Sequence, residues 1–178
     1  NGIKKVVCIG TCFEYGMLDG CLKENFETYP STSYGLAKDT LRKFLEELQN
    51  HYSFNLKWLR LFYPYGKDQN PRSLLSQLEK AIINKEKDFN MSGGEQLRDY
   101  LPIEKVAEYI AKVSLQDKYN GIINICNGKP VSVKSFVENY VKNKNVKLRL
   151  NLGYYPYPDY EPMEFWGDNS KLKKALSS

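Results

Sequence analysis

Short, continuous apolar runs alternate along this chain with longer segments in which apolar residues recur every three or four positions. The runs at residues 5–10, 55–62 and 121–126 predict buried parallel strands. The longer segments have the periodicity of amphipathic helices, and they cover residues 33–50, 73–84, 103–115, 132–143 and 169–176. Shorter strands are expected at residues 88–92 and 146–152, and three prolines predict a loop over residues 154–162. Strands that alternate with helices in this way predict an α/β fold with a parallel sheet.

The helix expected at residues 33–50 carries a stripe of apolar residues, while its other face is charged. The stripe consists of Ala37, Leu41, Phe44, Leu45 and Leu48. Part of it is expected to pack against the sheet, and the rest is available for a contact with another surface.

Composition adds little to this picture but excludes several classes of protein. A length of 178 residues predicts one compact domain. The net charge of +5 fits an anionic ligand, and no basic block is long enough to indicate a nucleic-acid partner. No apolar stretch approaches the roughly 18 residues that a membrane-spanning helix needs. Four cysteines and a single histidine match no zinc spacing, so we expect no metal site and reduced thiols in a cytoplasmic protein.

The most informative pair of residues is Tyr34 and Lys38, at the start of the longest expected helix. Residues four positions apart share a helix face, and a lysine cation beside a phenol lowers the pKa of the phenol. Such a phenol can exchange a proton with a substrate oxygen near neutral pH. Thr11, at the end of the first strand, could hold the same oxygen through its hydroxyl group. This combination predicts a site for carbonyl and alcohol redox chemistry.

The segments around these residues resemble the extended short-chain dehydrogenases/reductases, the NAD-dependent epimerase/dehydratase type, which act on nucleotide sugars. Residues 10–16 (GTCFEYG) look like the Ser/Thr-x-x-x-Tyr-Gly stretch of that family, and residues 30–38 (PSTSYGLAK) are similar to its Pro-x-x-x-Tyr-Gly-x-x-Lys. Residues 59–66 (LRLFYPYG), 93–101 (GGEQLRDYL) and 121–128 (GIINICNG) continue the resemblance in the same order. Within the family, the chain looks most like the 4-keto-6-deoxyhexose reductases and epimerases.

The resemblance also implies how the chain is organised. Members of this family begin with a strand and a Gly-x-x-Gly-x-x-Gly turn that binds the dinucleotide pyrophosphate, and no such turn precedes Thr11. We therefore expect the chain to be the C-terminal half of a longer enzyme, and to be inactive by itself. Residues 1–66 and 100–127 are expected to form part of a Rossmann-type sheet. Residues 67–99 and 128–178 are expected to form a smaller substrate-binding lobe interleaved with it.

The resemblance assigns roles to individual residues. Tyr34 is implied to be the catalytic acid or base, and Thr11 to bind the reacting oxygen by a hydrogen bond. Lys38 is implied to lower the pKa of Tyr34 and, together with Tyr34, to bind the nicotinamide ribose of NAD or NADP. Arg98 matches the arginine that relatives use against the nucleotide phosphates, and Arg72 is a second candidate for that role. The implied partners are a nucleotide-diphosphate sugar and a second copy of the chain, paired through the helix at residues 33–50.

Two departures from the family pattern narrow the expected reaction. The related dehydratases have an Asp-Glu pair directly after the threonine, where this chain has Cys12 and Phe13. Glu14 comes one position later and is expected to point away, because side chains alternate along an extended segment. A 4,6-dehydratase is therefore not expected. Tyr63 replaces the asparagine with which many relatives contact the sugar nucleotide, and it remains a candidate substrate-binding residue.

Three functions follow from these residues. The leading one is NAD(P)-dependent reduction of the 4-keto group of a nucleotide-linked 6-deoxyhexulose. A nucleotide-sugar 4-epimerase would use the same threonine, tyrosine and lysine. A protein of another class, a non-catalytic module that binds sugar nucleotides, would fit the missing glycine turn.

Overall fold

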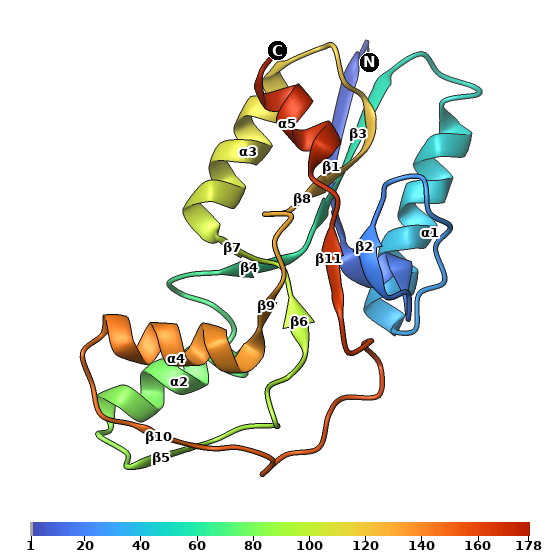
Figure 1. Cartoon of the computed structure of the whole chain (residues 1–178). Coiled ribbons are helices and arrows are strands. Elements are labelled where there is room, and N and C mark those ends of the chain that lie inside the picture. The colour runs from blue at the N-terminus through green and yellow to red at the C-terminus, as the bar shows by residue number, and fades with distance from the viewer. Residues whose placement is uncertain (1) are drawn as a thin grey trace.

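The computed structural model describes residues 2–178, and its centre is a three-stranded parallel sheet. The strands are β1 (Lys5–Thr11), β3 (Asn55–Leu61) and β8 (Gly121–Ile125), with β3 in the middle. Lys5 pairs with Asn55 and Thr11 with Leu61, so β1 and β3 end at the same edge of the sheet. Figure 1 shows α1 (Ser33–Leu48) on one side of the sheet and α3 (Ile103–Leu115) and α5 (Ser170–Leu176) on the other. The predicted parallel α/β fold is confirmed.

The side of the sheet that faces α3 and α5 is apolar. Leu59 and Ile123 point from the strands into a cluster with Val113 of α3 and Leu172 of α5, and all four side chains are buried. Burial of aliphatic side chains of this size stabilises the fold by about 1.5–3 kcal/mol each. This cluster therefore fixes both helices on the sheet.

A second group of elements forms a lobe beside the sheet, at the lower left of Figure 1. It consists of α2 (Leu74–Ile83), α4 (Val133–Asn143) and the parallel pair β5 (Asp88–Asn90) and β10 (Arg149–Asn151). Its core is separate from that of the sheet and is centred on Leu78 and Val137, neither of which is exposed. The lobe thus has its own apolar core.

Short elements connect the sheet and the lobe. They are the 3₁₀ turn η1 (Cys12–Tyr15), the parallel pair β2 (Gly20–Leu22) and β11 (Phe165–Gly167), the parallel pair β4 (Tyr63–Tyr65) and β7 (Tyr100–Pro102), and the antiparallel pair β6 (Leu97–Arg98) and β9 (Val131–Ser132). Each has two to four residues, too few for apolar periodicity to reveal them in the sequence.

The structure differs from the predicted division of the chain at its C-terminal end. Residues 165–176 were expected in the lobe, but β11 pairs with β2 and α5 packs on α3 and β8. The physical reason is the apolar side of the sheet, which Leu172 and Ala175 help to cover. The chain therefore returns from the lobe to the sheet before it ends.

The face of α1 that meets the sheet also differs from the prediction. Leu41 and Phe44 of the predicted apolar stripe are 44% and 62% exposed, whereas Asp39 and Arg42 are 2% and 7% exposed. The helix lies on the sheet with a polar face, because charged groups from β3 and η1 lie beneath it. Its exposed apolar face is left available for another surface.

No helix within residues 2–178 combines the length and the hydrophobicity required to cross a bilayer. The same residues contain no cluster of three or more His, Cys, Asp or Glu side chains arranged to hold a metal ion.

Candidate active site

Thr11 ends β1 and starts the turn η1, where the backbone stops extending the sheet. Its Oγ1 atom accepts a hydrogen bond from the backbone N–H of Phe13 at 3.3 Å, which caps the turn. A hydroxyl group that accepts one bond still has its own proton to donate. Thr11 is 5% exposed, so its hydroxyl group lies at the edge of the sheet and is largely shielded from water.

Tyr34 lies in the first turn of α1, close to η1. Thr32 caps the helix, because its Oγ1 accepts the N–H of Gly35 at 3.0 Å. A Cβ atom at Gly35 would lie 2.6 Å from the carbonyl oxygen of Phe13, so only glycine lets the helix approach the turn this closely. The Tyr34 ring meets the Phe13 ring edge-on, with their centroids 6.5 Å apart. The structure therefore brings Tyr34 next to the turn that carries Thr11.

Lys38 follows Tyr34 on the same face of α1, as the four-residue spacing predicts. Its Nζ atom donates to the carbonyl oxygen of Ile9 on β1 at 2.9 Å, and lies 6.0 Å from the centroid of the Tyr34 ring. An ammonium group has three donors, and this bond uses one of them. Lys38 thus ties α1 to the edge of the sheet and keeps donors for a ligand.

The electrostatics at Tyr34 differ from the sequence prediction that Lys38 lowers the pKa of this phenol. Partial burial raises the pKa of Tyr34, and the negative charge of Glu14 raises it further. The ammonium group of Lys38 is directed to the Ile9 carbonyl rather than to the phenol oxygen. Tyr34 is therefore held in its protonated form, the form that can donate a proton to a carbonyl oxygen.

Cys12 and Phe13 occupy the places of the dehydratase acid pair, and neither can transfer protons at neutral pH. Cys12 is 3% exposed, and this burial raises the pKa of its thiol far above the ordinary value. The Phe13 ring fills the space between the Tyr34 and Tyr63 rings. The chemistry of this corner of the site is thus limited to the hydroxyl groups of Thr11 and Tyr34.

Arg98 lies on β6 and is almost completely buried, with an exposed fraction of 3%. Its Nε and Nη2 atoms contact Oε2 of Glu161 at 3.0 and 2.9 Å, and its Nη1 donates to the backbone carbonyl oxygens of Leu97 and Met163 at 2.8 and 3.1 Å. The largely buried carboxylate of Glu161 therefore already occupies the guanidinium that was predicted to hold a nucleotide diphosphate.

Tyr63, the second predicted substrate-binding residue, belongs to the same cluster. Its hydroxyl group donates to Oε2 of Glu161, and its ring lies beneath the guanidinium of Arg98, 5.7 Å from ring centroid to Cζ. Burial raises the pKa of Tyr63 well above its ordinary value, and the Glu161 carboxylate raises it further. The neutral phenol is thus a hydrogen-bond donor to Glu161.

Arg98 is held in place by its neighbour in sequence. Asp99 is fully buried, and its carboxylate accepts the backbone N–H groups of Asn127, Gly128 and Gly167 at 2.7, 2.8 and 3.2 Å. These bonds join the chain after β6 to the ends of β8 and β11. The Arg-Asp pair therefore combines a side chain that contacts Glu161 with one that fixes the backbone.

The structure does not bring Arg72 to this group of residues. It lies exposed in the turn before α2. Within residues 2–178 its backbone N–H donates to Oδ1 of Asn70, and its carbonyl oxygen accepts a hydrogen bond from Nε2 of Gln77. Its assignment to the substrate remains a prediction.

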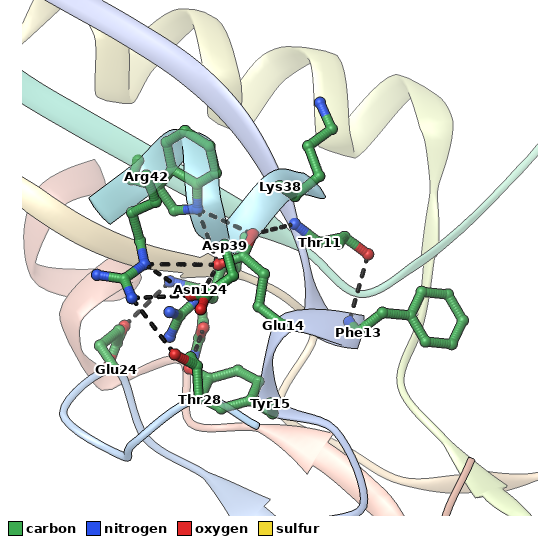
Figure 2. Close-up of polar contacts among 12 residues, drawn as sticks. Thr11, Phe13, Glu14, Tyr15, Glu24, Thr28, Lys38, Asp39, Arg42 and Asn124 are labelled. Atoms are coloured by element: carbon green, nitrogen blue, oxygen red, sulfur yellow. Dashed lines mark hydrogen bonds and ion pairs between the residues drawn. The ribbon is translucent and has the colours of Figure 1, made fainter. Parts of the chain in front are cut away.

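Sequence reasoning missed a buried polar network behind Thr11, which Figure 2 shows. Glu14 does point away from the site, but not because the segment is extended: η1 turns its side chain into the core, where it is 0% exposed. The carboxylate accepts the N–H of Thr11 at 2.8 Å and Nε of Arg60 at 2.7 Å. The Thr-x-x-Glu spacing of a capping box was the available signal.

Glu161 was also missed, and here the sequence offers no signal. It lies 63 residues from Arg98 in a stretch without regular secondary structure. No periodicity connects two such positions.

Comparisons with known proteins identify a family and a fold that this chain shares. A sequence model of the NAD dependent epimerase/dehydratase family matches residues 1–126. The chain is 31% identical over 167 residues to the dTDP-6-deoxy-L-talose 4-dehydrogenase (NAD(+)) of Aggregatibacter actinomycetemcomitans. The aligned residues cover 93% of this chain and 62% of that protein.

Two solved structures have a similar fold. One is a UDP-N-acetylglucosamine 4-epimerase from Methanobrevibacter ruminantium M1 in complex with UDP-N-acetylmuramic acid, with a TM-score of 0.89 and 25% identity. The other is a UDP-glucuronic acid 4-epimerase from Bacillus cereus in complex with UDP-glucuronic acid and NAD, with a TM-score of 0.84 and 25% identity. They match 98% and 97% of this chain, which covers 57% and 55% of theirs. The chain thus spans little more than half the length of the solved structures.

Proposed function

Because the chain belongs to the NAD-dependent epimerase/dehydratase family, we propose that the protein, as its gene encodes it, reduces the 4-keto group of a nucleotide-linked 6-deoxyhexulose with NADH or NADPH. The single observation that carries this proposal is the convergence of Tyr34, Lys38 and Thr11 at one edge of the parallel sheet. The similarity to a 4-dehydrogenase of a 6-deoxyhexose supports the choice of sugar.

Tyr34 and Thr11 have different roles at the carbonyl oxygen of the substrate. The Tyr34 hydroxyl gives its proton to this oxygen, and the Thr11 hydroxyl donates a hydrogen bond that stabilises the negative charge developing there. The cofactor, when bound, supplies the hydride for the carbonyl carbon. The raised pKa of Tyr34 suits the reduction, because the phenol then carries its proton at neutral pH.

The residues at the edge of the sheet fit a nicotinamide cofactor. Lys38 keeps two of its three donors after bonding to Ile9, and Tyr34 is 55% exposed, so both side chains can reach a ligand beside β1. They would hold the ribose hydroxyl groups next to the nicotinamide. Residues 2–178 contain no glycine-rich turn for the pyrophosphate, so these two residues are the part of the cofactor site that we assign.

Arg98 is the residue we propose for the nucleotide diphosphate. A guanidinium binds such an anion through paired hydrogen bonds. The carboxylate of Glu161 must first move away from Arg98, because it contacts both Nε and Nη2 of the guanidinium. Tyr63 donates to the same carboxylate, so it would be released for the substrate in the same step.

A nucleotide-sugar 4-epimerase is the second candidate, and both solved structures described above are 4-epimerases by name. Such an enzyme would use Thr11, Tyr34 and Lys38 in the same roles, but it would oxidise and reduce the same carbon in one cycle. It would consume no NAD(P)H overall.

One assay separates these functions. The protein is incubated with NADH or NADPH and a 4-keto-6-deoxyhexose linked to dTDP, GDP or UDP, and both cofactor oxidation and sugar products are followed. Stoichiometric oxidation of the cofactor with formation of a 4-hydroxy sugar is the expected result. Interconversion of 4-hydroxy epimers without net oxidation supports the epimerase. Binding of the sugar nucleotide without either reaction indicates a non-catalytic module and contradicts the proposal.

A further inference from the structure

Glu14 is a buried carboxylate next to the candidate site, and the proposed reaction does not use it. One of its oxygens accepts the backbone N–H of Thr11 at 2.8 Å, and the other accepts Nε of Arg60 at 2.7 Å. The indole N–H of Trp58 donates to both oxygens, at 2.9 and 3.0 Å. A carboxylate that is 0% exposed loses its hydration entirely, so these bonds are what makes its burial tolerable.

The position of Glu14 links the elements that carry the candidate catalytic residues. Its bond to Thr11 holds the end of β1, and its bond to Arg60 holds β3. Nε of Arg42 on α1 lies 3.9 Å from its Oε2 atom. Arg42 follows Lys38 by four residues and Tyr34 by eight, so all three share a face of the helix.

The backbone around Glu14 has the room that this network needs. A Cβ atom at Gly10 would lie 2.4 Å from Oε1 of Glu14 and 2.2 Å from the indole nitrogen of Trp58. Glycine therefore leaves room for the indole of Trp58 and the carboxylate of Glu14 beside the backbone of β1. Figure 2 shows the outcome: the N–H of Thr11 points to Glu14, and its hydroxyl group points to the other side, toward Phe13.

We propose that Glu14 is a positioning residue for the reaction, which acts by fixing the backbone of Thr11 so that the Thr11 hydroxyl lies in register with Tyr34. This inference rests on the function proposed above. It goes beyond that function, because Glu14 has no contact with substrate or cofactor in the proposed chemistry and works only through Thr11.

A test must separate positioning from simple stabilisation. Removal of Glu14 alone would leave Arg60 as an unpaired buried cation, and within residues 2–178 its Nη1 and Nη2 atoms already have no hydrogen-bond partner. Breaking a buried ion pair on one side is strongly destabilising, whereas replacing both partners by apolar groups is tolerated. Both variants of the test therefore carry Arg60→Met.

The two variants differ only in whether position 14 can accept a hydrogen bond. Glu14→Gln with Arg60→Met keeps an oxygen for the N–H of Thr11, and Glu14→Leu with Arg60→Met removes it. We expect the leucine variant to have a kcat about 10–100-fold below that of the glutamine variant, since a displacement of about 1 Å can cost this much. The KM for the nucleotide sugar should be similar in both.

Substitution of Thr11 provides the decisive comparison. In a Thr11→Ala background, the leucine and glutamine variants should have the same kcat, because the group that Glu14 positions is gone. Asp39→Asn serves as a control, since Asp39 is a buried carboxylate of the same helix-to-sheet contact that has no bond to Thr11. Its kcat should stay at the wild-type level. If the leucine variant fails to fold, Glu14→Met with Arg60→Met replaces it, because methionine adapts to irregular spaces.

Each outcome decides between defined alternatives. Equal kcat in the leucine and glutamine variants contradicts the positioning role, and so does a difference that persists in the Thr11→Ala background. A loss in Asp39→Asn as large as that in the leucine variant would also overturn it. If Thr11→Ala by itself leaves kcat unchanged, the proposed catalytic role of Thr11 fails instead.

Discussion

Two carboxylates near the candidate site, the buried Glu14 and the largely buried Glu161, have different relations to it. Glu14 is fully buried and accepts a hydrogen bond from the backbone N–H of Thr11. Glu161 occupies Arg98, the guanidinium that a diphosphate would need. A diphosphate that binds Arg98 would therefore have to displace Glu161, whereas Glu14 would stay in place.

Arg98 and Glu161 give a prediction about affinity for the nucleotide. Arg98→Lys should weaken the binding of a nucleoside diphosphate roughly 10–100-fold, because a charged hydrogen bond is worth about 1.5–3 kcal/mol. Glu161→Gln should strengthen it by up to about tenfold, or roughly 1.4 kcal/mol, because the competing charge is gone. Isothermal titration calorimetry with the nucleoside diphosphate measures both changes.

Arg149→Lys is the matched control for this titration, since Arg149 is exposed and paired with Asp88 on the lobe. Unchanged affinity in Arg98→Lys would make Arg98 a structural partner of Glu161. Weaker binding in Glu161→Gln would show that the carboxylate supports the site rather than competing for it.

The positions of the candidate site residues were predictable where they depend on short spacings within one helix or strand. Tyr34 and Lys38 share a helix face because they are four positions apart, and Thr11 was placed by the end of its strand. The state of the Tyr34 phenol was not predictable, because it depends on burial and on Glu14 from another element. The contact of Glu161 with Arg98 joins two distant segments through a loop, and no local pattern encodes it.

At the scale of elements, charged side chains hold the helices on the sheet at two places that an apolar pattern does not reveal. The first is the C-terminus of α3. Lys57 of β3 is 1% exposed, and its Nζ donates to the carbonyl oxygens of Val113 at 2.7 Å, Ser114 at 3.4 Å and Gln116. A cation at this end of a helix also meets the negative end of the helix dipole.

Lys57→Met should therefore lower the free energy of unfolding by about 1.5–3 kcal/mol, because the helix loses a charged hydrogen-bond donor. Lys112→Met is the control, as Lys112 is exposed on the same helix and pairs with Glu108 at the surface. That change should cost well under about 1 kcal/mol. Denaturant titrations of both variants provide the comparison, and equal midpoints would refute the role of Lys57 as a cap.

The second place is the polar face of α1. The carboxylate of Asp39 contacts Arg42 Nη2 and Lys43 Nζ, both at 2.8 Å. Burial raises the pKa of Asp39, but the hydrogen bonds from Lys43 and Arg42 outweigh it and hold the pKa below the ordinary value of 3.8. A carboxylate whose pKa is lower in the folded state contributes stability above its unfolded pKa and loses it as the pH falls through the folded pKa.

Asp39→Asn should thus reduce the free energy of unfolding at pH 7 by about 1–3 kcal/mol. The difference from wild type should shrink as the pH falls below about 4. Thermal unfolding at a series of pH values tests this, and a difference that stays constant down to pH 2 would argue against the ion pairs as its source.

The helices and long strands were predictable because each contains several repeats of its hydrophobic pattern, which recurs about every 3.6 residues in a helix and every two in a strand. The side of α1 that is buried was not, because an apolar stripe predicts burial only when an apolar surface lies beneath it. Trp58, Arg60 and Glu14 make the surface beneath α1 polar. The short strands that join sheet and lobe pair across long separations, and their two or three residues carry no pattern.

At the scale of the whole molecule, α1 leaves an apolar face uncovered that includes Leu36, Leu41 and Phe44, which are 44–62% exposed. Exposed apolar faces are typical of interfaces, and the homodimer that the sequence predicts through this helix includes Leu41 and Phe44.

If the protein forms the predicted dimer, Phe44→Glu should convert it to a monomer, since the change places a charge on this apolar face. Ile83→Glu is the matched control, because Ile83 is 77% exposed on α2 in the lobe. Sedimentation equilibrium of the protein as its gene encodes it should give a dimer for wild type and the control, and a monomer for Phe44→Glu. A wild-type protein that stays monomeric at high concentration would contradict the predicted interface.

The central claim is that Tyr34 donates the proton in the reduction of a nucleotide-linked keto sugar, and the kcat of Tyr34→Phe tests it most directly. This change removes only the hydroxyl group. Tyr52→Phe serves as the control, because Tyr52 is 66% exposed beyond the far end of α1. With NAD(P)H oxidation as the readout, Tyr34→Phe should lose about 10²–10⁴-fold in kcat and keep its affinity for the sugar nucleotide. A Tyr34→Phe enzyme with the kcat of the Tyr52→Phe control would contradict the account.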